Sequence, residues 1–231
     1  MVAIVLLPGM DGSGDFFAEL TSALKTKSVV VSYPVDRPLG YSELTELVRA
    51  ALPTDEPFIL LAESFSGPIA IALASERLPQ LRALVLVCSF ARLPELPLHA
   101  MLKKVATRVP VWRVPVSLAA RVLLGRYRST AIEARLKRAI RLVSPAVWRA
   151  RIRAAFAADE TSSLFRIQVP LLYLRASEDK VMLPAASAAI ARHVPTAKVV
   201  EIEGPHFLLQ AKPRESAAVV EAFCKEHGLT L

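Results

Sequence analysis

Several features that would place a protein in a special class are scarce in this sequence. It has two cysteines, Cys88 and Cys224, far apart in the chain. They predict neither a disulfide framework nor a cysteine-based metal cluster. No apolar run approaches the roughly 18 residues of a membrane-spanning helix. The first run, Val2–Leu7, ends at Pro8, lacks a basic leader and is too short for a signal peptide. These absences favour a cytoplasmic protein without a transmembrane segment.

Repeats and cofactor motifs are also missing from the sequence. We find no internal repeat, no low-complexity tract, no metal-ligand spacing and no glycine-rich phosphate loop. We therefore expect no cofactor and no bound metal. The basic residues carry no recognition motif for nucleic acid, and the rest of the chain is acidic, so we expect no nucleic-acid partner.

Apolar strands that alternate with helical patterns dominate the chain. Its 231 residues, 53% of them apolar, suit one large α/β domain. Short runs rich in Val, Ile and Leu predict strands buried on both faces of a doubly wound parallel sheet. The expected strands are Val2–Leu7, Ser28–Tyr33, Phe58–Ala62, Ala83–Cys88, Pro170–Arg175 and Lys198–Ile202. The expected helices lie near Gly14–Leu24, Ser42–Ala51, Phe65–Arg77, Pro184–His193 and Lys212–His227.

Positive charge is concentrated in one internal segment, Arg92 to Arg166. It holds 16 Lys and Arg against four acidic residues, whereas the rest of the chain holds 13 against 17. This asymmetry predicts two modules: a core of residues 1–91 and 167–231, and residues 92–166 inserted as a helical lid. Three or four lid helices are predicted, one of them opening at Ser144-Pro145. Their apolar stripes are Leu98, Met101, Leu102, Val105 and Val109, then Ile132, Leu136, Ile140 and Val143, then Trp148, Ile152 and Phe156.

The charge of this basic lid has two interpretations. In the first, Arg and Lys stems cover apolar surface while their charged ends face solvent. In the second, the lid docks an anionic partner. That partner would be an acyl carrier protein, a CoA ester, a phosphorylated metabolite or an acidic lipid surface, the last through peripheral membrane contact. The sequence does not choose between the two.

The stretch Ala62-Glu63-Ser64-Phe65-Ser66-Gly67 follows the third expected strand. A strand that ends in Ser between small residues and turns into a helix is typical of a nucleophile elbow, which lifts the hydroxyl clear of the sheet. Ala62 and Ser66 stand where two glycines are usual. The alternative is that Ser64 merely caps the helix that begins at Phe65.

A serine nucleophile needs a base, and the base needs an acid that orients it. Asp179 follows the fifth expected strand and His206 follows the sixth, which is the order that this architecture requires. Glu178 is the alternative acid, and an acidic pair in a loop also fits simple turn chemistry. We interpret Asp11, in the Asp11-Gly12 pair, as a turn residue rather than a catalytic acid.

These residues together resemble the α/β-hydrolase superfamily, over nearly the whole chain. The loop Leu7-Pro-Gly-Met-Asp-Gly-Ser-Gly14 is similar to the family's first strand-end loop, in which the residue after the first Gly lends an N–H to the oxyanion hole. Residues 92–166 occupy the family's lid position. The resemblance implies these roles: Ser64 nucleophile, Asp179 acid, His206 base, and Met10 and Phe65 as backbone donors to the oxyanion.

Two departures from the family pattern stand out. Pro8 replaces a His that is common in that loop, which bears on how the loop is braced. The chain begins at what is usually the third strand, so the resemblance implies a minimal six-stranded, mostly parallel sheet with helices on both faces. The wording Pro-Gly-x-Asp-Gly-Ser/Thr-Gly is also similar to a branch with esterase-like and acyltransferase-like members.

The sequence therefore predicts a serine hydrolase that cleaves a carboxylic ester or thioester through an acyl-enzyme on Ser64. An apolar acyl pocket is expected under the lid. Two alternatives stay open: an acyltransferase that uses the same triad, and a non-catalytic small-molecule receptor on the same fold.

Overall fold

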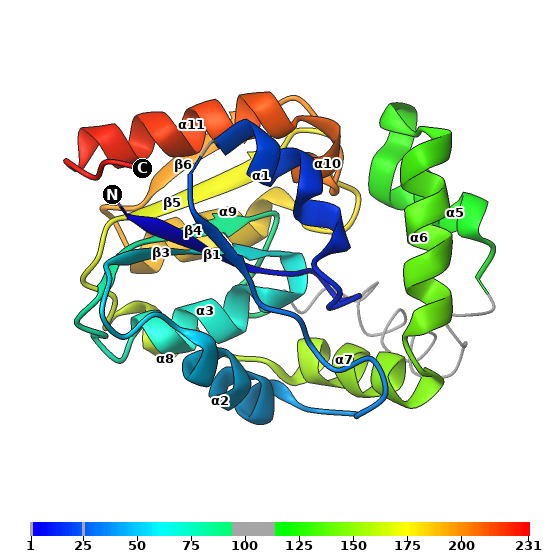
Figure 1. The fold of residues 1–231 in the computed structure, drawn as a ribbon, viewed down its shortest axis with the longest axis horizontal. Coiled ribbons are helices and arrows are strands. Elements are labelled where there is room, and N and C mark those ends of the chain that lie inside the picture. Colours follow the sequence, from blue (N-terminus) through cyan, green and yellow to red (C-terminus); the bar gives the residue numbers. More distant parts are fainter. Residues whose placement is uncertain (1, 25, 94–113) are drawn as a thin grey trace.

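A six-stranded sheet forms the centre of the computed structural model, which describes residues 2–24, 26–93 and 114–231 (Figure 1). The strand order is β2-β1-β3-β4-β5-β6, and every neighbouring pair runs parallel. The strands are β1 (Ala3–Leu7), β2 (Ser28–Val30), β3 (Phe58–Glu63), β4 (Leu81–Val87), β5 (Leu171–Ala176) and β6 (Lys198–Ile202). The sheet confirms the predicted fold class.

Helices cover both faces of the sheet, because successive strand residues point to opposite sides. In β1, for example, Val5 and Leu7 join one buried cluster, whereas Ile4 and Leu6 join the other. The first cluster packs against α2 (Tyr41–Ala51), α3 (Gly67–Ala74), α8 (Thr161–Leu164) and α9 (Pro184–His193). The second packs against α1 (Ala18–Leu24), α10 (Leu208–Ala211) and α11 (Pro213–Glu226).

The segment of residues 92–166, which the sequence predicts as an insertion, is mostly helical where the structure describes it. It contains α5 (Val116–Leu124), the 3-10 turn η4 (Gly125–Tyr127), α6 (Thr130–Leu142) and α7 (Pro145–Ala157). As predicted, Ser144 caps α7: its Oγ accepts the Val147 N–H at 3.3 Å, and Pro145 is the first helical residue. These helices share a third cluster that also takes in Phe16 of the core.

Predicted and observed elements differ in a few places. The stripe from Leu98 to Val109 lies outside the described residues. Strand β2 ends at Val30 rather than at Tyr33, because the Tyr33 N–H donates to the Gly12 carbonyl at 2.8 Å instead of extending the ladder. Helix α10 was not predicted, and the lid boundaries at residues 92 and 166 stay a prediction.

No helix in the described part of the chain is both long enough and apolar enough to cross a membrane. Since all strands run parallel, their carboxyl ends share one edge of the sheet. The loops after β1, β3, β5 and β6 meet at that edge, and they carry the candidate site.

Candidate active site

Ser64 sits at a strained turn directly after β3. Its φ is +48°, in the left-handed region that a serine rarely adopts. The chain then makes the 3-10 turn η2 (Ser64–Ser66) and enters α3. The Ser64 hydroxyl lies 2.9 Å from His206 Nε2 and caps neither η2 nor α3. The turn therefore presents the hydroxyl to a base, as a nucleophile elbow does.

The elbow is packed so closely that Gly67 tolerates no side chain. A Cβ on Gly67 would lie 1.9 Å from Ser89 Oγ and 2.8 Å from the Phe90 carbonyl oxygen. Ser89 Oγ in turn donates to the Ser64 carbonyl at 2.5 Å. The glycine thus admits the hydroxyl that holds the elbow in place.

Ser66, which replaces one of the usual elbow glycines, has a partner that explains it. Its hydroxyl donates to the Pro8 carbonyl and accepts the Tyr33 hydroxyl proton at 2.6 Å. Burial raises the pKa of Tyr33 far above its ordinary value, so this phenol stays protonated and can donate. Ser66 therefore joins the elbow to the loop after β1.

His206 and Asp179 form the other half of the arrangement. His206 Nδ1 lies 2.8 Å from Asp179 Oδ2, and both side chains are almost fully buried. Asp179 Oδ1 accepts the N–H groups of Val181 and Met182 at 2.7 and 2.8 Å. Burial alone would raise the pKa of Asp179, but its bond from His206, the charge of that ring and these two N–H groups together lower it.

An ionised Asp179 accepts the proton on His206 Nδ1, which leaves Nε2 as the atom that faces the Ser64 hydroxyl. The rival acid, Glu178, points elsewhere and pairs with Arg126 at 2.7 Å. The structure thus brings Ser64, His206 and Asp179 into one hydrogen-bonded chain.

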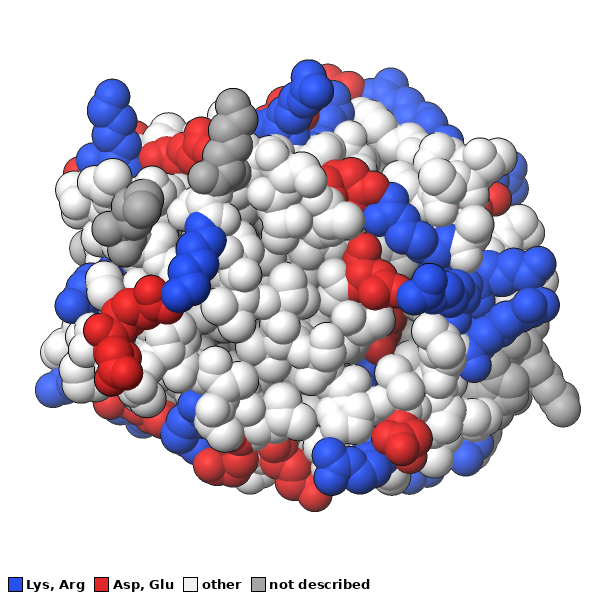
Figure 2. All heavy atoms as spheres, viewed as in Figure 1, with Lys and Arg blue, Asp and Glu red and all other residues white. Residues whose placement is uncertain are grey.

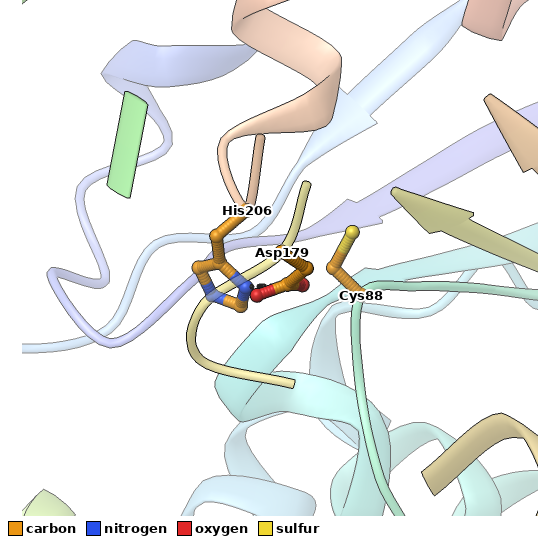
Figure 3. A group of neighbouring side chains, drawn as sticks. All are labelled: Cys88, Asp179 and His206. Carbon is orange, nitrogen blue, oxygen red and sulfur yellow. Dashed lines mark hydrogen bonds and ion pairs between the residues drawn. The ribbon is translucent and has the colours of Figure 1, made fainter. Parts of the chain in front are cut away.

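Cys88 approaches the same two residues, and Figure 3 shows the three side chains together. Their possible metal-ligating atoms lie within 4.8 Å of one another. However, both Asp179 oxygens and His206 Nδ1 are engaged in hydrogen bonds. Burial, and then the Asp179 charge, raise the pKa of Cys88, which favours a neutral thiol over the thiolate that binds metals. We therefore interpret Asp179 and His206 as members of a hydrogen-bonded triad with Ser64 rather than as metal ligands.

Glu63 is a site residue that the sequence did not single out. It is buried directly before Ser64 in the chain, and Gln210 Nε2 donates to its carboxyl at 3.0 Å. Burial raises the pKa of Glu63 to about 7, although the Gln210 bond and the nearby His206 oppose the shift. The sequence signal that could have identified Glu63 is its position, one residue before Ser64.

The loop after β1 forms a tight turn from Gly9 to Gly12. The Gly12 N–H donates to the Gly9 carbonyl at 3.0 Å, and Gly12 has a φ of +72°. Asp11 Oδ2 accepts the Ser13 N–H at 2.9 Å, in agreement with the interpretation of Asp11 as a turn residue. A trans peptide holds its N–H opposite its carbonyl, so the Met10 N–H points away from Gly12. Phe65, the second expected donor, directly follows Ser64 in η2.

The helices of the predicted lid contact the rest of the chain through charged as well as apolar side chains. Arg135 pairs with Glu19, and Arg138 pairs with Asp15 at 3.0 Å. Figure 2 shows basic side chains gathered over the α5–α6 side, with acidic side chains at their border. Part of the lid charge therefore meets the acidic core. Other basic residues of the lid are exposed, namely Arg121, Lys137, Arg141, Arg149 and Arg153.

Comparison with known proteins agrees with this geometry. The family model described as the alpha/beta hydrolase family matches residues 4–219. The chain belongs to this family. None of the curated protein sequences compared with the chain matches it significantly.

Solved structures of other alpha/beta hydrolases share the fold. An enol-lactonase from Burkholderia xenovorans LB400 has a TM-score of 0.84 at 18% identity, covering 97% of this chain and 91% of that one. MenH from S. aureus has a TM-score of 0.82 at 17% identity, covering 98% and 94%. A thermophilic esterase from Thermogutta terrifontis has a TM-score of 0.80 at 17% identity, covering 98% and 90%. At such low identity these likenesses show the family fold alone.

Proposed function

We propose that the protein is a serine hydrolase that cleaves a carboxylic ester or thioester through an acyl-enzyme on Ser64. One observation carries the proposal: Ser64, His206 and Asp179 form a continuous hydrogen-bonded chain at the edge of the sheet where this family binds ligands. The match to the alpha/beta hydrolase family supports hydrolysis as the reaction class.

The first half of the reaction forms the acyl-enzyme. His206 Nε2 takes the Ser64 hydroxyl proton as the oxygen attacks the substrate carbonyl carbon, and the Asp179 carboxylate stabilises the charged ring. The carbonyl oxygen becomes an oxyanion, held by the N–H groups of Met10 and Phe65. When the carbonyl re-forms, the bond to the alcohol or thiol breaks, and His206 returns the proton to that leaving group.

The second half releases the acid. His206 takes a proton from water, whose oxygen attacks the acyl carbon and again generates the oxyanion. Collapse of this intermediate breaks the bond to Ser64, and the serine oxygen recovers its proton from His206. The products are a carboxylic acid and an alcohol or thiol.

The proposed substrate and location follow from the same features. We propose a cytoplasmic enzyme for a small acyl ester or thioester, whose acyl chain lies under the lid. The exposed basic residues of α5, α6 and α7 support docking of an anionic carrier such as an acyl carrier protein or CoA. The enol-lactonase and the esterase among the structural neighbours act on ester bonds, which supports this bond class.

A fluorophosphonate probe tests the nucleophile directly, because it phosphonylates an activated serine. We expect the wild type to be labelled and Ser64→Ala to remain unlabelled. Ser162→Ala is the matched control, since Ser162 is exposed on α8, and it should be labelled like the wild type. Persistent labelling of Ser64→Ala would overturn the assignment.

Product analysis decides what accepts the acyl group. With an added alcohol or amine in excess water, the hydrolase should release mainly the free acid. Preferential transfer to the acceptor would make the protein an acyltransferase that uses the same triad. A total lack of turnover on short p-nitrophenyl esters and acyl-CoAs would instead indicate a receptor.

A further inference from the structure

We propose that Arg151 of the lid helix α7 is a positioning residue that holds the loop of residues 8–12 in the shape that binds the oxyanion. The inference rests on the proposed function, since it concerns the Met10 N–H of that mechanism. It assigns to the lid a part in the chemistry, in addition to any part in covering the substrate.

The contacts of Arg151 are all made inside the protein. Its side chain is 1% exposed. Nη1 donates to the carbonyls of Met10 and Asp11, both at 2.8 Å, and Nη2 donates to the Pro34 carbonyl at 2.9 Å. The guanidinium also lies over the Tyr33 ring, 5.7 Å from its centroid. One side chain therefore bridges α7, the oxyanion loop and the segment after β2.

The carbonyls of the loop show why this bridge matters. The Pro8 carbonyl accepts the Ser66 hydroxyl, the Gly9 carbonyl accepts the Gly12 N–H, and the Gly12 carbonyl accepts the Tyr33 N–H. The carbonyls of Met10 and Asp11 are held by Arg151. Without Arg151 these two carbonyls would lose their donor, in the very peptides that follow the Met10 N–H.

Arg151 fixes the peptide plane on one side of Met10, while the Gly9–Gly12 turn fixes the plane on the other side. The Met10 N–H lies in the rigid Gly9–Met10 peptide, whose direction the Gly9–Gly12 turn sets, and Arg151 holds the next peptide so that this turn keeps its shape. Oxyanion stabilisation depends on donors that are in place before the charge develops. This is the property that Arg151 supplies.

Gly12 is matched to Arg151. A Cβ on Gly12 would lie 2.7 Å from Nη1 and 2.8 Å from Nη2 of Arg151, so only glycine lets the guanidinium come this close. Pro8, at the start of the loop, offers no side-chain donor of its own. The brace therefore comes from a residue far along the chain.

The charge of Arg151 adds a second effect. The hydrogen bonds of its guanidinium go to three backbone carbonyls, which carry no net charge. Burial penalises this charge and lowers the pKa of Arg151, and the nearby Asp11 carboxylate partly opposes that shift. The field of the guanidinium reaches the loop that receives the negative oxyanion, where a fixed positive charge favours the transition state.

The experiment compares Arg151→Met and Arg151→Lys with the wild type on a p-nitrophenyl ester. Arg192→Met is the matched control, because Arg192 is an exposed arginine on α9, away from the lid helices. Active sites are counted by fluorophosphonate labelling run to completion, so that kcat refers to folded, competent molecules. A trifluoromethyl ketone, whose serine adduct carries an oxyanion, reports transition-state binding separately.

We expect Arg151→Met to lower kcat per active site about 100-fold with little change in KM, the size of loss that a misplaced donor causes. Affinity for the trifluoromethyl ketone should fall by a similar factor, while Arg192→Met stays at the wild-type level. Arg151→Lys keeps a positive charge but loses the forked geometry of the guanidinium, so its kcat per active site should fall about tenfold. If Arg151→Met does not fold, the Arg151→Lys variant still tests the inference.

A merely structural role gives a different pattern. The Arg151 variants would then melt at lower temperature, but kcat per titrated site and ketone affinity would match the wild type, which would overturn the inference. Failure of the proposed function is separable, because it shows in the wild type as absent turnover and absent labelling of Ser64, before any Arg151 variant is made.

Discussion

Glu63 places a titrating carboxyl directly beside Ser64, the proposed nucleophile. Its side chain is buried, Gln210 donates to it, and its pKa is raised to about 7. Gln210 Oε1, on the same amide, is a buried acceptor without a partner among the described residues. A protonated Glu63 carboxyl has an O–H that can donate to such an acceptor, whereas the ionised carboxylate has no donor. The charge inside the site therefore changes near neutral pH.

This raised pKa predicts how stability depends on pH. Because the folded-state pKa of Glu63 lies above its ordinary 4.5, folding disfavours the charged form, and stability falls as pH rises from about 4.5 to 7. A shift of this size corresponds to about 3 kcal/mol. Relative to the wild type, Glu63→Gln should therefore gain about 2 to 3 kcal/mol in free energy of unfolding between pH 5 and pH 8.

Urea unfolding of both proteins at the two pH values measures this difference. Glu221→Gln, a substitution at an exposed glutamate of α11, is the control and should track the wild type. Parallel pH profiles for Glu63→Gln and the wild type would show that Glu63 does not titrate in this range.

At the scale of elements, α6 docks on the start of α1 by a mixed contact. Phe16 belongs to the apolar cluster of the lid helices, and Arg135 and Glu19 make a two-pronged ion pair beside it. The hydrogen bond from Arg135 lowers the pKa of Glu19, so this contact is present above the ordinary pKa and is lost as pH falls.

A double-mutant cycle measures what this ion pair contributes. Arg135→Gln and Glu19→Gln should each destabilise the protein slightly, with a coupling of about 0.5 to 1 kcal/mol near neutral pH and low salt, since both side chains are partly exposed. Pairing Arg141→Gln of the same helix with Glu19→Gln should give no coupling. Strict additivity for Arg135 and Glu19 would contradict the docking contact.

The same scale shows what sequence patterns can and cannot predict. The strands were predictable because Val, Ile and Leu runs must be buried on both faces, and Ser144-Pro145 marked the start of α7 locally. The end of β2 was not, because it depends on a bond from Tyr33 to Gly12 in another loop. Short α10 has only four residues, too few for a periodic pattern.

The residues of the site also fall into those that the sequence predicts and those that it does not. Residue types and chain order pointed to Ser64, Asp179 and His206, because each lies at a predicted strand end. The roles of Ser66 and Arg151 were not visible, since their partners are distant: Arg151 meets Met10 across 141 positions. Periodicity describes which face of a helix is buried but not which backbone carbonyl a buried arginine finds.

At the scale of the whole molecule, charge distinguishes residues 92–166, the predicted lid, from the rest of the chain. Some lid arginines meet acidic side chains of the core, while others, such as Arg141 and Arg153, are exposed. The exposed residues are therefore compatible with both interpretations of the lid charge. The exposed part is available for the anionic carrier that we propose.

Salt dependence tests that carrier. If the exposed lid charges attract it, kcat/KM for an acyl-CoA should fall about tenfold between 0.05 and 0.5 M salt, because ions screen the attraction. A neutral ester should change less than about twofold. Replacing Lys137 and Arg141 by Gln should weaken the salt effect on the acyl-CoA alone. Equal salt responses for both substrates would indicate that these residues form a solvated face that binds no carrier.

The strained backbone of Ser64 has a consequence for how this protein can be altered. A non-glycine residue at a φ of +48° costs on the order of 1 kcal/mol or more, a cost that glycine or asparagine largely avoids. Laboratory evolution for heat resistance alone would therefore favour replacement of the very residue that we propose as the nucleophile. Any such selection must screen for turnover in parallel, or it will enrich robust but inert variants.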